Sequence, residues 1–471
     1  MPTIPIAPSR LHDDASAHAA DLATLVRRLR PAVAFADDAA LGARVAALLP
    51  GTAVVTDVAT LESTPTPTVA RCARAVNART VAKVMLTSGT TGAYKGVLTT
   101  HGMIVSNQVA FSQVWPLFDR EPPVLVDWLP WSHAFGGTKV LNFALHRGGT
   151  LYVDDGLPTP GDFARTIAHL RDVAPTLYFN VPRGYALLVA ALENDAALRA
   201  TFFSRLRLAF SAAATLPPSL AKRFARLRAN GSSRAVPLVA GWGLTETAPG
   251  ATCVHQYAAA PNAIGVPLPG VEIKLAPVDG RDELRVRGPN VTPGYAGEAD
   301  ATRAAFDEEG FFRSGDAGRL VDDARPERGF TFAGRLAENF KLSTGVWVRA
   351  TLLRDALLEA AAPLLADVLL TGDDADDVCA IVFLAPGACD DATTRAQLSR
   401  ALSAAAAGAT GPSGRIARAL VASDPPSAAA GELTAKGTLN RAVALKRRST
   451  DVSRLYPRHA NDDPDLLWPA P

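Results

Sequence analysis

The sequence carries almost no excess charge of either sign. Its 471 residues include 48 Lys and Arg against 46 Asp and Glu, which gives a formal net charge of only +2. A protein that binds nucleic acid or an anionic membrane through charge normally has a strong basic excess. We therefore expect small-molecule partners and no nucleic-acid partner.

Cysteines and long apolar runs are equally scarce. The four cysteines, Cys72, Cys253, Cys379 and Cys389, show neither metal-ligand nor disulfide spacing, and reduced thiols in a cytosol are the simplest account of them. No apolar run approaches the length of a membrane span. Residues 1–8 lack the basic and apolar blocks of a signal peptide. The sequence therefore predicts a cytoplasmic protein with no membrane span.

What the sequence does contain is an alternation of short apolar strands and helical segments. Apolar residues recur with helical spacing over 100–111 and 163–171. Strands are expected at 81–86, 124–130, 150–153, 176–181, 206–211 and 237–241. Repeated β-α-β units indicate a mostly parallel sheet covered by helices. In such sheets, ligands bind at the carboxyl ends of the strands.

The pattern changes after residue 265. Segments 271–275 and 283–287 alternate apolar and polar residues, as half-exposed antiparallel strands do, and they predict a small β-barrel-like subdomain. Residues 342–471 have the pattern of a small α+β domain. The predicted fold class is therefore α/β, with a large N-terminal domain of mostly parallel sheets covered by helices, the β subdomain, and a small α+β C-terminal domain.

A stretch rich in glycine and hydroxyl residues follows the strand expected at 81–86. It reads Thr87-Ser88-Gly89-Thr90-Thr91-Gly92-Ala93-Tyr94-Lys95-Gly96. Glycines let backbone N–H groups close on phosphate oxygens, hydroxyls add donors, and the lysine supplies a mobile positive charge. The spacing differs from a Walker loop, in which Ser or Thr follows the lysine. Most such runs are solvated turns, but a turn explains neither the lysine nor the preceding strand, so we favour a polyphosphate loop.

A second candidate segment, Gly241-Trp242-Gly243-Leu244-Thr245-Glu246-Thr247, follows the strand expected at 237–241. An aromatic face suits a stacked adenine, a carboxylate oxygen suits Mg²⁺ on a triphosphate, and the hydroxyl of Thr245 can bond a phosphate. The alternative is a plain helix start with Thr245 as its cap.

Together these segments resemble the adenylate-forming superfamily, which comprises acyl- and aryl-CoA synthetases, luciferases and peptide-synthetase adenylation domains. The resemblance runs from Val81 to Tyr456 and includes five motifs in the superfamily's order. It implies use of ATP with Mg²⁺, activation of a carboxylic acid as an acyl-adenylate, and transfer of the acyl group to coenzyme A. The chain looks most like the feruloyl-CoA synthetase branch, which implies a hydroxycinnamic, ferulate-like acid.

The resemblance also assigns roles to individual residues. Asp316, in Phe-Arg-Ser-Gly-Asp, would accept hydrogen bonds from the ribose hydroxyls, and Arg335 would contact ribose and phosphate at a hinge between the domains. Ala337 departs from the superfamily, because many members carry Asp or Lys there. The other residues assigned to ATP are Thr87, Ser88, Gly89, Thr90, Thr91, Gly92, Lys95, Gly241, Trp242 and Thr245, with Glu246 as the metal ligand.

Two further residues are assigned to the acid and to catalysis. His133 follows Leu-Pro-Trp-Ser and resembles a gate in the wall of the acyl pocket, although a lone histidine beside aromatics is more often a core residue. Lys436 is taken as the catalytic lysine. It precedes Gly437, whereas the superfamily's lysine usually follows the glycine. The alternative is a surface lysine in a basic tail, with the true one elsewhere, such as Lys446.

The resemblance implies a large domain over 1–334, with its β subdomain over 265–334, and a small mobile domain over 335–471. Superfamily members place more residues ahead of the phosphate loop, so we expect part of the first subdomain to be absent and an edge to be exposed. Two alternatives stay open. One is another acyl-CoA synthetase or adenylation enzyme, and the other is a truncated, inactive nucleotide-binding paralogue.

Overall fold

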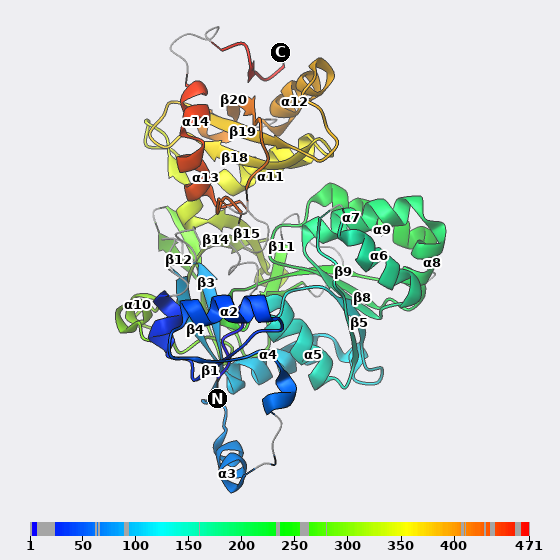
Figure 1. Cartoon of the computed structure of the whole chain (residues 1–471). Helices are drawn as coiled ribbons and strands as arrows, with labels where there is room; N and C mark the ends of the chain where they lie inside the picture. Colours follow the sequence, from blue (N-terminus) through cyan, green and yellow to red (C-terminus); the bar gives the residue numbers. More distant parts are fainter. Residues whose placement is uncertain are drawn as a thin grey trace.

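The computed structural model of the chain describes residues 2–6, 24–61, 64, 66–88, 94–159, 161–231, 236–254, 263–278, 280–406, 409, 411–427, 430–433, 439–456 and 463–470. A large N-terminal domain carries a smaller C-terminal domain at one end (Figure 1). Within the described residues, no helix is both long and apolar enough to cross a membrane.

The parallel part of the large domain follows the predicted alternation of strands and helices. The strands are β5 (Val124–Asp127), β6 (Thr150–Val153), β7 (Leu177–Asn180), β8 (Leu208–Ser211) and β9 (Leu238–Trp242). The helices are α4 (His101–Val114), α5 (Leu141–His146), α6 (Phe163–Asp172), α7 (Pro182–Asn194), α8 (Ala196–Ser204) and α9 (Pro218–Gly231). Every residue of β7 and β8 is buried, as expected for parallel strands that are covered on both faces.

The antiparallel strands continue the same sheet. They are β10 (Thr252–Cys253), β11 (Ala263–Pro267), β12 (Glu272–Val278), β13 (Arg281–Arg287), β14 (Phe312–Leu320) and β15 (Phe330–Arg335). The nine-stranded order is β12-β13-β14-β15-β11-β10-β9-β8-β7. The sequence suggested a separate barrel-like unit. The strands are instead continuous with the parallel ones, because β10 pairs antiparallel with β9, Thr252 opposite Trp242.

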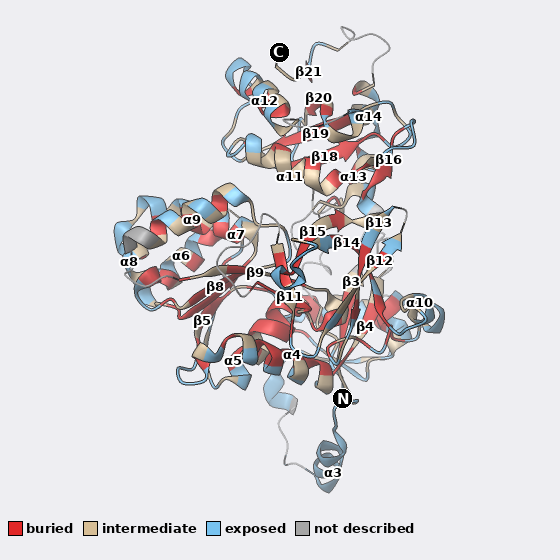
Figure 2. Ribbon diagram, turned by 180° about the vertical axis from the view of Figure 1, so that it is seen from behind, coloured by how far each residue is buried: buried red, intermediate tan, exposed pale blue. Residues whose placement is uncertain are grey.

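The first described segments form smaller layers. Strand β1 (Val33–Phe35), helix α2 (Ala39–Leu48) and strand β2 (Ala53–Val55) make one β-α-β step with parallel pairing. Strands β3 (Val81–Ser88) and β4 (Tyr94–Thr100) pair antiparallel as a hairpin. Figure 2 shows burial concentrated on the sheet strands, whereas α3 (Pro67–Ala75) has no buried residue.

The small domain is an α+β unit with its own apolar core. Its sheet has the order β18 (Leu365–Thr371), β19 (Val378–Leu384), β20 (Ile416–Val421) and β21 (Leu466–Leu467). Its helices are α11 (Ala350–Ala360), α12 (Ala392–Ala405), α13 (Arg441–Arg447) and α14 (Ser449–Arg454). The predicted α/β class, with a large N-terminal domain and a small C-terminal one, is confirmed, and the main sheet is mixed.

The two domains touch through polar side chains. Ser219, at the start of α9, donates from its backbone N–H and its hydroxyl to the carboxylate of Glu359 on α11, at 3.0 and 2.7 Å. Oδ1 of Asp355, on the same helix, accepts from Nη1 of Arg354 at 3.3 Å. Burial nevertheless raises the pKa of the Asp355 carboxyl to about 6.

Candidate active site

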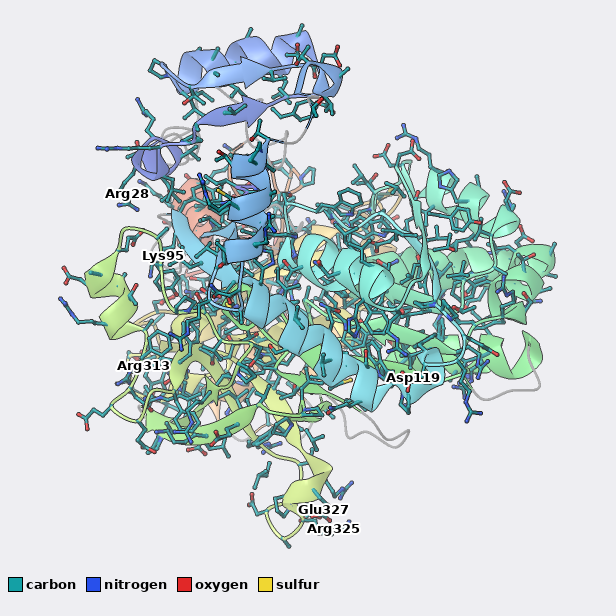
Figure 3. All side chains as sticks on the ribbon, turned by 90° about the horizontal axis from the view of Figure 1, so that it is seen from below. Arg28, Lys95, Asp119, Arg313, Arg325 and Glu327 are labelled. Carbon is teal, nitrogen blue, oxygen red and sulfur yellow. The ribbon has the colours of Figure 1, made fainter. Side chains whose placement is uncertain are left out.

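The predicted phosphate loop is the connection of the β3–β4 hairpin. Thr87 pairs with Lys95 across the ladder, and Ser88 pairs with Tyr94. The remaining loop residues, Gly89, Thr90, Thr91, Gly92 and Ala93, lie outside the described residues. In Figure 3 Lys95 lies on the side of the large domain that carries Arg28 and Arg313, away from Asp119. The ammonium of Lys95 lies 4.9 Å from the centre of the Tyr295 ring.

Tyr295 links this lysine to the predicted metal ligand. Its phenol donates a hydrogen bond of 3.1 Å to Oε1 of Glu246. Burial, and then the negative charge of Glu246, raise the pKa of the Tyr295 phenol above its usual value, so the tyrosine remains a donor at neutral pH. Sequence reasoning missed Tyr295. The only signal was an aromatic residue after the turn pair Pro293-Gly294.

Glu246 lies in a three-residue 3₁₀ turn, Thr245–Thr247. The capping role that we weighed for Thr245 belongs to Thr247, whose hydroxyl accepts the backbone N–H of Leu244 at 2.8 Å. The carbonyl of Gly250, just beyond the turn, accepts from the side-chain amides of Asn107 and Asn290, both at 2.8 Å. Segment 244–250 is therefore fixed from two sides by buried amides.

Three of the predicted nucleotide residues meet where the ends of β9 and β15 reach the middle of β14. The indole N–H of Trp242 on β9 donates to Oδ2 of Asp316 on β14 at 2.7 Å. Nε of Arg335 on β15 lies 2.9 Å from Oδ1 of the same carboxylate. Asp316 and Arg335 are register partners across the β14–β15 ladder, so the ladder itself sets this ion pair.

Trp242 offers little free ring surface. The residue is only 9% exposed, and its ring packs in an apolar cluster with Ile264, Leu284 and Phe330. Its indole N–H orients the Asp316 carboxylate. Stacking of the Trp242 ring on adenine stays a prediction.

His133 is the N-cap of the helix η4 (Ala134–Val140), and its Nδ1 accepts the backbone N–H of Phe135 at 3.2 Å. The side chain is half-buried, and Trp131 nearby is 46% exposed. The role of His133 as a gate of the acyl pocket stays a prediction.

The predicted catalytic lysine, Lys436, lies outside the described residues, but the chain on either side of it is held firmly. Leu433 and Leu439 form an antiparallel bridge. Glu432, which is fully buried, accepts from Nε of Arg448 at 2.7 Å. Sequence reasoning missed this buried ion pair, because Glu432 and Arg448 have no distinguishing local pattern.

One acidic cluster lies away from the site. Asp154, Asp155 and His169 could approach a common ion. Both oxygens of Asp154 are, however, already used by the backbone N–H of Gly156, the hydroxyl of Thr166 and Nδ1 of His169. We assign no role to this cluster.

The described geometry defines an α/β protein in which a carboxylate, an indole and a guanidinium from three strands of one mixed sheet lie together. Residues 12–296 match the AMP-binding enzyme family, and residues 339–460 match the AMP-binding enzyme C-terminal domain. The first match covers more than half of the chain. The chain therefore belongs to the AMP-binding enzyme family.

Three known proteins show how far the similarity extends. The human long-chain-fatty-acid–CoA ligase 6 is 27% identical over 312 residues, which cover 56% of this chain and 42% of that protein. Feruloyl-CoA synthase from Amycolatopsis sp is 30% identical over 252 residues, covering 52% and 48%. The crystal structure of ATP-bound MatB from Rhodopseudomonas palustris has a TM-score of 0.69 at 24% identity, covering 91% and 81%. The last likeness shows the fold alone, and the matches span less than half the length of these two curated relatives.

Proposed function

We propose that the chain is an ATP-dependent carboxylate–CoA ligase that forms an acyl-adenylate and then a coenzyme A thioester. The observation that carries the proposal is the meeting of Trp242, Asp316 and Arg335 in a chain of the AMP-binding enzyme family. Similarity to a feruloyl-CoA synthase supports a hydroxycinnamic, ferulate-like acid. Similarity to a long-chain-fatty-acid–CoA ligase makes an aliphatic acid the competing substrate.

In the first half-reaction a carboxylate oxygen of the acid attacks the α-phosphorus of ATP, and pyrophosphate leaves. Positioning and charge neutralisation provide most of the acceleration in such a transfer. Lys436 would bridge the attacking carboxylate and the α-phosphate, and the loop from Thr87 to Lys95 would hold the leaving pyrophosphate. Asp316 would accept hydrogen bonds from the ribose hydroxyls, and Arg335 would contact the ribose and phosphate.

Glu246 fits a magnesium ligand in this scheme. Mg²⁺ is usually held by one or two carboxylates together with substrate phosphates, and Glu246 lies beside Tyr295, which also contacts Lys95 of the phosphate loop. When bound, Mg²⁺ would neutralise charge on the triphosphate. The phenol of Tyr295 would hold the Glu246 carboxylate in one orientation.

In the second half-reaction the thiol of coenzyme A displaces AMP. We propose that the domains are 1–334, with the β subdomain over 265–334, and 335–471, and that the small domain rotates between the two steps. Gly334 has φ of +94° next to the proposed hinge residue Arg335, a conformation that suits glycine. Such a position can absorb backbone rotation, which offsets the loss of polar hinge contacts at Ala337.

The test is ATP–pyrophosphate exchange by the full chain with a panel of hydroxycinnamic and fatty acids. Lys436→Ala should lower exchange by roughly 10²–10³-fold, the scale for removing one preorganised charge donor. Lys446→Ala is the matched control and should leave exchange unchanged. If Lys446→Ala lowers exchange and Lys436→Ala does not, the catalytic lysine is Lys446. A parent chain that exchanges with no acid would instead indicate an inactive nucleotide-binding paralogue.

A further inference from the structure

The helix capped by His133 is unusual. It is a π-helix, Ala134–Val140, and it runs directly into α5, with the N–H of Leu141 bonded to the carbonyl of Gly136. Short π segments are rare and occur frequently at functional sites. The widened turn frees carbonyls that side chains from other segments take up. Nζ of Lys83 donates to Gly137 O at 2.5 Å, and Nε2 of Gln108 donates to Thr138 O at 3.1 Å.

One π-helix residue, Lys139, has a fully buried amine. The residue is 1% exposed, and Nζ has no hydrogen-bond partner among the residues that the structure describes. Several aromatic rings lie close to it. The ring centres of Phe111, Phe143 and Trp115 lie 3.2, 4.4 and 4.9 Å from Nζ.

This arrangement is costly for the folded protein. An amine buried without an acceptor loses its hydration, and the attraction to ring faces offsets only part of that loss. Burial accordingly lowers the pKa of the Lys139 ammonium well below its usual value. A methionine would fill the same space without this cost, so the amine needs an explanation outside folding.

The aromatic cluster around Lys139 lies against the segment that carries the proposed nucleotide residues. A Cβ at Gly250 would lie 2.5 Å from the Phe111 ring. A Cβ at Gly241 would lie 2.7 Å from the ring of Phe210, whose centre lies 6.1 Å from that of Phe111 and 5.4 Å from that of Trp115. The two glycines flank the segment that contains Trp242 and Glu246. The rings therefore pack on the backbone that ends in the proposed adenylation site.

We propose that Lys139 determines substrate specificity by binding an oxygen substituent on the ring of an aromatic carboxylic acid. This inference rests on the proposed ligase function and assigns its substrate class. The lysine stem has four rotatable bonds, so the amine can turn from the face of Phe111 to the ring hydroxyl of the acid. The aromatic neighbours favour a planar substrate, whereas a fatty acid would bring no hydrogen-bonding group to the amine.

The experiment compares two acids that differ by one hydroxyl, para-hydroxycinnamic acid and cinnamic acid, in pyrophosphate exchange by the full chain. The parent should prefer the hydroxylated acid by roughly 10–100-fold in kcat/KM, because a site built to bond a hydroxyl discriminates strongly against an analogue that lacks it. Lys139→Met should bring this ratio close to one, mainly through a higher KM for the hydroxylated acid, and should retain turnover of cinnamic acid. The exposed Lys222 supplies the control, Lys222→Met, which should keep the parent ratio.

Several outcomes would overturn the inference. An unchanged ratio in a well-folded Lys139→Met protein would show that the amine does not touch the acid. A parent that prefers malonic or decanoic acid would show that the substrate class is wrong. If the parent exchanges with no acid at all, the ligase function itself fails, and that result is distinct from the other two because it appears before any variant is made.

Discussion

Two buried ionisable side chains in the large domain differ in the polar partners that surround them. Asp316 is 2% exposed, and its carboxylate is bonded to the indole of Trp242 and the guanidinium of Arg335. Lys139 is 1% exposed, and its amine faces aromatic rings. The protein supplies partners for the first group and, among the described residues, no hydrogen-bond partner for the second.

The comparison separates two uses of buried charge. A carboxylate with its partners in place is already oriented before a ligand arrives, and removing it leaves those partners unsatisfied. An amine without a partner weakens the folded state, and removing it should strengthen that state. The same degree of burial therefore predicts effects of opposite sign on stability.

The largest effect is expected at Asp316. Asp316→Ala leaves the buried indole N–H of Trp242 without its acceptor and removes the ion partner of Arg335, whose side chain is 39% exposed. The change should lower the free energy of unfolding by about 3 kcal/mol. Asp316→Asn, which keeps an acceptor oxygen, should lose less. Urea unfolding of the three proteins measures both values. Equal stability of the parent and Asp316→Ala would show that the carboxylate is not oriented by its partners.

The next effect has the opposite sign. Lys139→Met should raise the free energy of unfolding by about 1–3 kcal/mol, the cost of burying a polar group that makes no hydrogen bond. The measurement is again urea unfolding, with Lys222→Met as the control that should match the parent. A clear loss of stability in Lys139→Met would mean that the ring contacts more than offset the desolvation of the amine. The predicted difference in sign between Asp316 and Lys139 would then be wrong.

The stability difference between Lys139→Met and the parent should depend on pH. The pKa of Lys139 is lowered in the folded state, so below its usual value of about 10.4 the unfolded chain binds a proton that the folded chain releases. The parent therefore gains stability as pH rises from the lowered pKa towards 10.4. Its deficit relative to Lys139→Met should shrink by about 1.4 kcal/mol per pH unit in that window. A deficit constant between pH 6 and 10 would show that the amine stays protonated.

The smallest expected effect on stability concerns Asp355, a half-buried carboxyl with fewer partners than Asp316 and more than Lys139. The Asp355 carboxylate accepts a hydrogen bond from Arg354, yet burial raises its pKa to about 6. The folded chain then binds a proton that the unfolded chain lacks, so stability should rise by about 1 kcal/mol as pH falls from 7 towards 5. Asp355→Asn should remove this contribution. The check is the difference in melting temperature between the two proteins over that range, and a difference that does not change with pH would contradict it.

Trp242 and Asp316 could be predicted because each lies in a local motif. Trp242 lies at the end of a strand that the sequence shows clearly, and Asp316 lies in the segment Phe-Arg-Ser-Gly-Asp. The ladder between β14 and β15 then places Asp316 opposite Arg335. Lys139 could not be found this way. The rings around it come from α4, α5 and the residue after α4, and a lysine in such a segment is normally assigned to the surface. Tyr295 was missed for the same reason, since its partners Glu246 and Lys95 are far away in the chain.

The π-helix has a consequence for how this protein can change by mutation of its gene. A π turn contains one residue more than an α turn, so deleting a single codon within Gly136-Gly137 would restore ordinary α-helical geometry. Each residue of an α-helix advances by about 100° around the axis, so the deletion would rotate Lys139 off the aromatic cluster relative to His133. On the proposed role of Lys139, gain or loss of one codon here would change acid preference in one step, with no substitution at Lys139.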